Sequence, residues 1–329
     1  MVLNKLKAKI NKLKEKKYLP FEQDGKTYNL YNLPWGFVIK GDLDLSNKGL
    51  TELPDLSRVV VKGNFSCHNN ELTSLEGAPK EVGGDFYCNY NNLTSLEGAP
   101  KKVGGSFWCN DNQLTSLKGA PKKVGKIFDC SRNQLTSLEG APKEVSEGFS
   151  CFENKLTSLE GAPKKVGIVF HCSYNQLTSL VGAPKEIDGL FCCDNNQLTS
   201  LEGAPEVVSG DFHCSSNELI SLEGAPIVVE GEFNCRDNKL TSLVGVPQLK
   251  EDGKIYCDDS IGDKYGFSDT KENGIKYEDL CKSPLYRSEE AMNRVRGKQQ
   301  QEPKAKQQEK INAEFSQWLK DNANKPTRE

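Results

Sequence analysis

Twelve cysteines are the side chains of this chain best able to do chemistry, and nine of them recur every 21 residues. A row of thiols could form disulfides or bind a metal ion. No histidine or carboxylate occurs at a matching inward position, so one cysteine per repeat predicts a column of free, buried thiols. We therefore predict no metal site and no cofactor. The nine are Cys67, Cys88, Cys109, Cys130, Cys151, Cys172, Cys193, Cys214 and Cys235.

The cysteines belong to a repeating unit with the pattern F-x-C-x-x-N-x-L-T-S-L-x-G-x-P-x-x-V, seen first at Phe65 and then at Phe86. A fixed period of this length predicts a solenoid. Because successive side chains of a strand point to opposite faces, Phe65 and Cys67 should face the core and Ser66 the outside. Asn70 and its equivalents should satisfy backbone groups of the neighbouring coil. Glycine and proline of the G-x-P segment should reverse the chain.

The segment F-x-C-x-x-N-x-L-x-x-L resembles the leucine-rich repeat, L-x-x-L-x-L-x-x-N-x-L, with Phe and Cys replacing two leucines. It is most similar to the short class of about 21 residues found in bacteria and bacteriophages. The resemblance implies a mainly β repeat solenoid: parallel short strands are stacked, Gly/Pro turns lie on the convex side, and the ends are short helices. The chain departs from that class in the four-residue step from Val82 to Phe86.

Cys257-Asp258-Asp259 is similar to the C-x-D element of bacterial effector ubiquitin ligases, some of which carry such repeats. However, Cys257 occupies the core position of the last repeat, and only about 70 residues follow it. Residues of one column on neighbouring repeats are simply stacked, so they do not compose a nucleophile with its base. We predict that the protein is not an enzyme and has no catalytic residues.

The pattern predicts four regions: a basic amphipathic helix and N-terminal cap (1–40), the solenoid (41–258), a C-terminal cap (259–286), and a polar linker with a short amphipathic helix (287–329). The formal net charge of the chain is −3, with +6 on residues 1–17 and +3 on residues 287–329, which leaves −12 on residues 18–286. An acidic solenoid repels phosphate backbones, so nucleic acid is an unfavourable ligand for it.

Both ends leave alternatives open. Residues 1–17 could complete the cap, bind a partner or a second copy of the chain, or contact a membrane or nucleic acid; a membrane contact is not favoured. The C-terminal helix around residues 311–319 could dock on the solenoid or on another protein. No signal peptide and no apolar run long enough to span a membrane occur, which predicts a cytoplasmic protein, of a bacterium or of a phage in its host.

The positions that vary between repeats indicate where the solenoid does not dictate the residue. They fall between Phe and Cys and directly after Cys, and we expect them on the exposed side of the strands. Aromatic and ionisable side chains there suggest a recognition surface, although drift on a tolerant surface is the alternative. The leading hypothesis is a non-catalytic protein-binding module, and the alternative is a structural or assembly subunit of a larger particle. The predicted binding residues are Tyr87, Tyr90, Trp108, Asp111, Asp129, Arg132, Phe152, His171, Tyr174 and His213.

Overall fold

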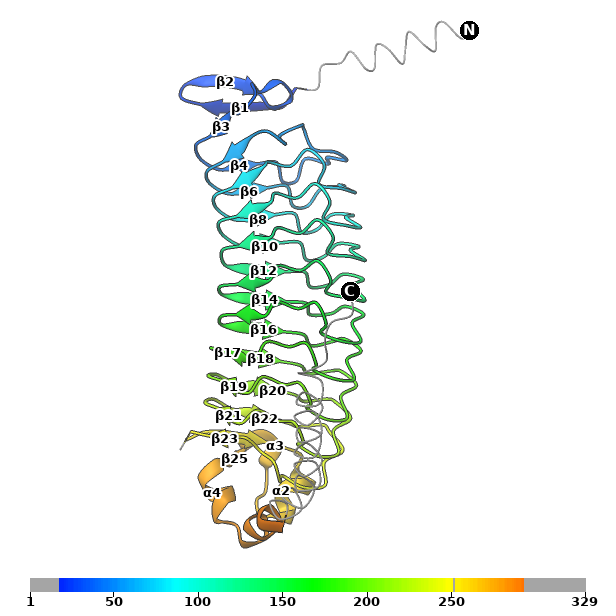
Figure 1. Ribbon diagram of the computed structural model, residues 1–329, viewed down its shortest axis with the longest axis vertical. Helices are drawn as coiled ribbons and strands as arrows, with labels where there is room; N and C mark the ends of the chain where they lie inside the picture. Colours follow the sequence, from blue (N-terminus) through cyan, green and yellow to red (C-terminus); the bar gives the residue numbers. More distant parts are fainter. Residues whose placement is uncertain (1–17, 251, 293–329) are drawn as a thin grey trace, which may run out of the picture.

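The protein is a β-solenoid of stacked repeats, as Figure 1 shows for the computed structural model. The structure describes residues 18–250 and 252–292. The predicted helix within residues 1–17 and the one around residues 311–319 lie outside these ranges. The predicted fold class, a repeat solenoid of short parallel strands, is confirmed. The boundaries between the solenoid and its two caps stay predictions.

One sheet of twelve strands carries the phenylalanine column and runs the length of the stack. Eleven of its strands are parallel to their neighbours, and β25 (Ile275–Lys276) closes the sheet antiparallel to the last of them. The eleven are β4 (Leu43–Asp44), β6 (Phe65–Ser66), β8 (Phe86–Tyr87), β10 (Phe107–Trp108), β12 (Ile127–Asp129), β14 (Gly148–Ser150), β16 (Val169–His171), β18 (Leu190–Cys192), β20 (Phe212–His213), β22 (Phe233–Asn234) and β24 (Lys254–Tyr256).

A second row of parallel strands precedes the first within each repeat and forms one sheet of seven strands and one of four. The seven are β3 (Val38–Ile39), β5 (Val60–Val61), β7 (Glu81–Val82), β9 (Lys102–Val103), β11 (Lys123–Val124), β13 (Glu144–Val145) and β15 (Lys165–Val166). The four are β17 (Glu186–Ile187), β19 (Val207–Val208), β21 (Val228–Val229) and β23 (Gln248–Leu249).

Glycines such as Gly83, Gly104, Gly125 and Gly167 occupy the corner between the two rows of strands in several repeats. The four-residue step from Val82 to Phe86 is therefore a bend between two strands. A Cβ atom added at Gly104 would overlap the carbonyl oxygen of Gly83 in the previous repeat. At Gly104 the absence of a side chain permits this close approach of the two backbones.

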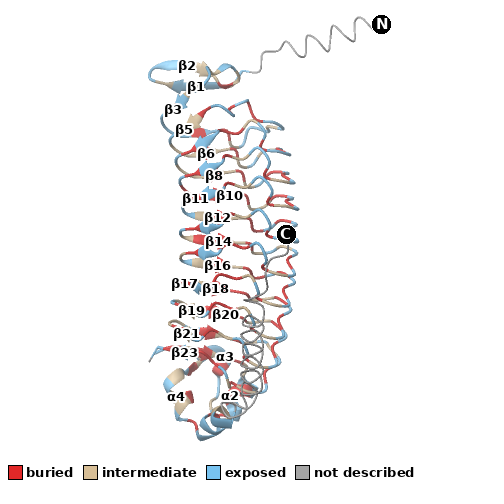
Figure 2. Cartoon of the chain, viewed as in Figure 1, coloured by how far each residue is buried: buried red, intermediate tan, exposed pale blue. Residues whose placement is uncertain are grey.

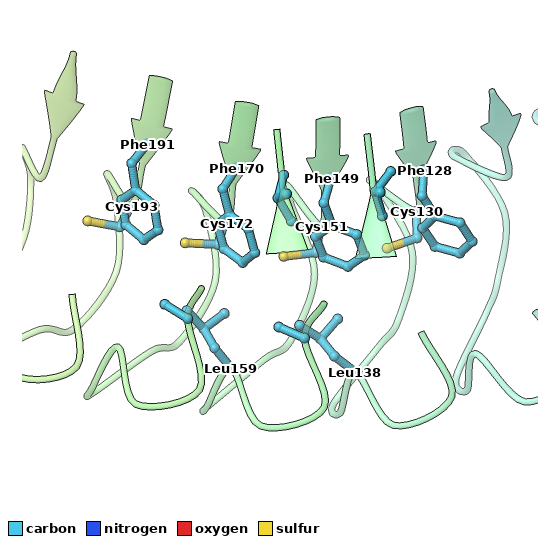
Figure 3. Packing of buried hydrophobic residues seen from close by; sticks show 14 of the residues in the cluster. Phe128, Cys130, Leu138, Phe149, Cys151, Leu159, Phe170, Cys172, Phe191 and Cys193 are labelled. Atoms are coloured by element: carbon cyan, nitrogen blue, oxygen red, sulfur yellow. The ribbon is translucent and has the colours of Figure 1, made fainter. Parts of the chain in front are cut away.

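The core lies between the strands and the return segments, as the burial pattern in Figure 2 shows. All nine phenylalanines of the repeat are fully buried, and neighbouring rings stack with centroids 5.1–5.8 Å apart. Figure 3 shows the rings in a row beside the thiols, with Leu138 and Leu159 facing them. The cysteines of the column are buried and free, as predicted, and burial raises the pKa of the Cys151 thiol far above its ordinary value.

The asparagine ladder is also confirmed. Nδ2 of Asn133 donates to the carbonyl oxygens of Cys109, Cys130 and Ser131 at 3.1, 3.0 and 3.0 Å. Its Oδ1 accepts the backbone N–H of Leu114 at 2.9 Å. Asn133 thus joins its own repeat to the previous one through backbone groups of both.

Both ends of the stack carry other elements. At the N-terminal end, β1 (Pro20–Gln23) and β2 (Lys26–Asn29) form an antiparallel hairpin, followed by the 3-10 helix η1 (Leu30–Asn32). At the C-terminal end lie α2 (Asp259–Lys264), α3 (Thr270–Asn273) and α4 (Tyr277–Lys282). Within the part of the chain that the structure describes, no helix has the length and apolar character needed to cross a membrane.

Candidate protein-binding surface

Nine strands of the twelve-stranded sheet direct a phenylalanine inward, so the residues just before and just after it face outward. Five predicted binding residues follow a phenylalanine on neighbouring or nearby strands: Tyr87, Trp108, Asp129, His171 and His213. All five are half-buried by the neighbours on their own face. We call this outward side of the sheet the strand face.

Tyr87 and Trp108 form the aromatic end of the strand face. Their rings are nearly parallel, with centroids 6.3 Å apart and an interplanar angle of 4°. The Tyr87 hydroxyl donates to Oδ2 of Asp85 at 2.9 Å. The pKa of Tyr87 is raised, mainly by burial and to a lesser extent by this hydrogen bond. The Nε1 hydrogen of Trp108 has no acceptor among the described residues. This pair is rigid and amphipathic, as binding anchors commonly are.

A second outward column, which was not predicted, directly precedes the phenylalanines. In the early repeats it holds polar caps: Oδ1 of Asn64 accepts the backbone N–H of Asp85 at 2.8 Å, and Oδ1 of Asp85 accepts that of Ser106 at 2.7 Å. In the middle repeats it holds Ile127, Gly148, Val169 and Leu190, and these residues pair in register as extra strand positions. The change from polar to apolar residues at this repeat position is visible in the sequence.

A hollow of about 300 Å³ lies where this apolar column meets the aromatic one. Ile127, Ile168 and Val169 supply apolar walls, and Ile168 is 54% exposed. The floor is open because Gly148 has no side chain. We call this site the strand-face hollow; its other lining residues are Trp108, Asp129, Glu147, Phe149, Ser150 and His171.

Two ionisable groups border the strand-face hollow. Burial raises the pKa of Asp129, against the effect of the hydrogen bond that its Oδ1 accepts from the Ser131 backbone N–H at 2.9 Å. Burial lowers the pKa of His171, against the opposite effect of the nearby carboxylates Asp194 and Asp129. In both groups burial disfavours the charged form.

Four predicted binding residues lie in the turn beyond the strand instead of on the strand face. Tyr90, Asp111, Arg132 and Tyr174 adopt left-handed backbone conformations with φ of 51–56°. This conformation is uncommon outside glycine, asparagine and aspartate, and it points these side chains to the rim of the surface. The sequence predicted these four residues on the exposed side of the strands, whereas they lie in a row of turns that follow the strands.

The rim contacts the strand face through Phe152. Its ring centroid lies 4.8 Å from that of His171 and 5.2 Å from that of Tyr174, and the Arg132 guanidinium lies 5.8 Å from it. Arg132 also pairs with Asp111 at 3.8 Å and with Glu153 at 3.1 Å. The structure thus brings Phe152, His171, Tyr174 and Arg132 together. The ion pairs are exposed and contribute little to stability.

His213 belongs to a separate cluster. Its Nδ1 lies 3.8 Å from Sγ of Cys192 on the neighbouring strand, and Asp194 lies beside both. Cys192 occupies an outward position and was not among the predicted binding residues. The sequence does show this cysteine, at the repeat position between Phe and Cys where other repeats carry Ser150, His171 or Asn234.

Cys257 does not have the environment of a nucleophile. It is fully buried, and burial raises the pKa of its thiol to about 11. The hydroxyl of Thr270 donates to the Cys257 carbonyl oxygen at 3.2 Å and lies 3.6 Å from the sulfur. Reactive cysteines carry lowered pKa values and partial exposure.

Comparison with known proteins finds no matching family model and no matching curated protein. Among solved structures, the chain is similar to the leucine-rich-repeat protein YopM from Yersinia enterocolitica WA-314, with 20% sequence identity and a TM-score of 0.32. The similarity covers 67% of this chain and 62% of the YopM chain, so the chain spans less than two thirds of that protein.

Proposed function

We propose that this protein is a non-catalytic binding module whose partner is another protein, bound across the strand face. The observation that carries the proposal is the strand-face hollow, an apolar depression bordered by Trp108 on a solenoid of net negative charge. Apolar patches rimmed by polar residues are typical of protein interaction sites. The cytoplasmic setting and the bacterial or bacteriophage class stay predictions.

The hollow suits an apolar side chain that projects from a partner. Ile127, Ile168 and Val169 would pack against such a side chain, while Trp108 and Tyr87 would lie under the adjacent part of the partner. Tyr90, Arg132 and Tyr174 would form the polar and aromatic rim.

Filling the hollow tests the proposal. Gly148→Leu adds a side chain between Ile127 and Val169, where a Cβ atom meets its nearest neighbours at 3.6–3.7 Å, an ordinary contact distance. Immobilised wild-type chain and this variant are incubated with lysate, and the captured proteins are quantified by mass spectrometry. We then expect the protein captured by wild type to bind the variant at least about tenfold more weakly when purified and titrated, which corresponds to about 1.4 kcal/mol.

Ile220→Ala is a control for changing an exposed apolar side chain away from the hollow. Ile220 is 61% exposed and lies outside the twelve-stranded sheet, so the variant removes apolar surface at a distance from the hollow. It should retain full binding. Equal affinity of wild type, Gly148→Leu and Trp108→Ala for every captured protein would overturn the proposal, provided that circular dichroism shows all three folded.

A further inference from the structure

Cys192, Asp194 and His213 present three different metal-binding groups at one place on the solenoid. Their ligand atoms all lie within 4.8 Å of one another. Cys192 ends β18, His213 ends β20, and the two residues pair in sheet register. Asp194 follows two residues after Cys192, which brings its carboxylate back beside the same pair.

The spacing of the donors matches that of a zinc site. With Zn–S of about 2.3 Å and Zn–N of about 2.0–2.1 Å, a tetrahedral angle places sulfur and nitrogen about 3.6 Å apart. Sγ of Cys192 and Nδ1 of His213 lie 3.8 Å apart. The two ligands therefore need only a small adjustment to share one ion.

The carboxylate of Asp194 is held in place by groups around the cluster. Its Oδ1 accepts the backbone N–H of Ser215 at 2.8 Å and the Ser215 hydroxyl at 2.6 Å. The hydroxyl of Ser173 donates to the other oxygen, Oδ2, at 3.4 Å. Hydrogen bonds of this kind orient metal ligands and are part of functional metal sites.

We propose that Cys192, Asp194 and His213 bind one Zn²⁺ ion on the strand face, with the fourth coordination position open to water. A thiolate and an imidazole select zinc over magnesium and calcium, which prefer oxygen ligands. Binding releases the thiol proton of Cys192 to solvent as the Zn–S bond forms. His171 is not among the three ligands, because its ring packs on Phe152 with centroids 4.8 Å apart.

A catalytic Cys–His pair is the other chemistry that this contact could serve. It requires a thiolate in the resting protein and access for a substrate. Cys192 is only 7% exposed, and burial raises the pKa of its thiol to about 12, with the charges of Asp194 and Asp211 acting in the same direction. A bound cation offsets those two negative charges, whereas a nucleophile would have to overcome them.

Cobalt titration tests the site. The full-length chain, freed of metal by a chelator and kept reduced, is titrated with Co²⁺ and then with Zn²⁺ in competition. We expect one equivalent of Co²⁺ to give a thiolate-to-cobalt charge-transfer band in the near ultraviolet, which Zn²⁺ then abolishes. Cys192→Ser should lose the band, and Asp194→Ala and His213→Ala should each weaken Co²⁺ binding by at least about 100-fold.

Two controls separate this site from binding elsewhere. His68→Ala removes a histidine of the first repeats, whose Nδ1 contacts the Ser66 hydroxyl at 2.7 Å, and Cys281→Ser removes the one cysteine that is only half-buried. Both should bind Co²⁺ like wild type. The proposal is overturned if wild type shows no charge-transfer band, or if Cys281→Ser loses it while Cys192→Ser keeps it. Thermal unfolding without metal confirms that each variant is folded.

Discussion

Gly148 lies in register beside Val169, and a Cβ atom added at Gly148 would lie 3.7 Å from Cβ of Val169. Its backbone therefore does not require glycine, and its effect is to open the strand-face hollow. The corner glycines are different, because there the backbone of the previous repeat occupies the space of a side chain. Gly148 thus shapes the binding surface, whereas corner glycines such as Gly104 allow neighbouring repeats to pack closely.

This difference predicts opposite responses to the same substitution. Gly148→Ala should change the free energy of unfolding by less than about 1 kcal/mol. Gly104→Ala should lower it by roughly 1–3 kcal/mol, because its new methyl group overlaps the Gly83 carbonyl oxygen. Urea unfolding followed by circular dichroism measures both. Equal midpoints for the two variants would refute the steric explanation of the corner.

The asparagine ladder should be a strong contributor to stability. Asn133→Ala removes donations to Cys109, Cys130 and Ser131 and leaves the Leu114 N–H without its acceptor. Each buried polar group left unsatisfied lowers the free energy of unfolding by about 1–3 kcal/mol. We therefore expect the urea midpoint to fall clearly. Gln134→Ala is the control, since that side chain is exposed in the same turn. A similar midpoint for the two variants would contradict the role assigned to Asn133.

The phenylalanine column should tolerate little loss of volume. The Phe149 ring stacks between Phe128 and Phe170 at 5.8 and 5.6 Å and is fully buried. Phe149→Ala should destabilise the protein by about 3–5 kcal/mol, and Phe149→Leu by less, because leucine leaves a smaller cavity. Phe152→Ala, on the half-buried outer face, should cost less than Phe149→Ala in the same assay. The reverse order would mean that the column is not the main core.

Asp129 should make stability depend on pH. Its pKa is raised in the folded protein, chiefly by burial, so the unfolded chain releases its proton first. Below its ordinary pKa of 3.8, Asp129 is protonated in both the folded and the unfolded chain, and its carboxyl does not oppose folding. As pH rises through the higher pKa of the folded state, ionisation of the buried carboxyl lowers the free energy of unfolding. Asp129→Asn should therefore have a higher Tm than wild type at pH 7. The difference should vanish below about pH 4, and a constant difference across that range would exclude this cause.

The thiols should react in the order of their exposure. All twelve cysteines are free; eleven are buried and Cys281 is half-buried. We expect one thiol to react quickly with a chromogenic disulfide reagent in the native protein, and the rest only after denaturation. Cys281→Ser should remove the fast phase, and the site of modification is checked by peptide mass mapping. A fast phase with many equivalents would show that the core column opens readily.

The 21-residue period by itself determined the solenoid, the inward phenylalanine and cysteine columns and the asparagine ladder. Each of these depends only on which residues share a position in the repeat, because a stack places equivalent positions side by side. It also identified Tyr87, Trp108, Asp129, His171 and His213 as outward residues. The same comparison of repeats also shows apolar residues directly before the phenylalanines, at Ile127, Val169 and Leu190, but this column was not predicted.

Only the tertiary structure decided how residues at different repeat positions meet. The left-handed turns of Tyr90 and Tyr174, the ring contacts of Phe152, and the approach of Asp194 to His213 depend on side-chain direction and on distances between neighbouring coils. A period fixes the order of positions along the chain, but it does not fix where the strand ends or how far a side chain reaches across the next coil.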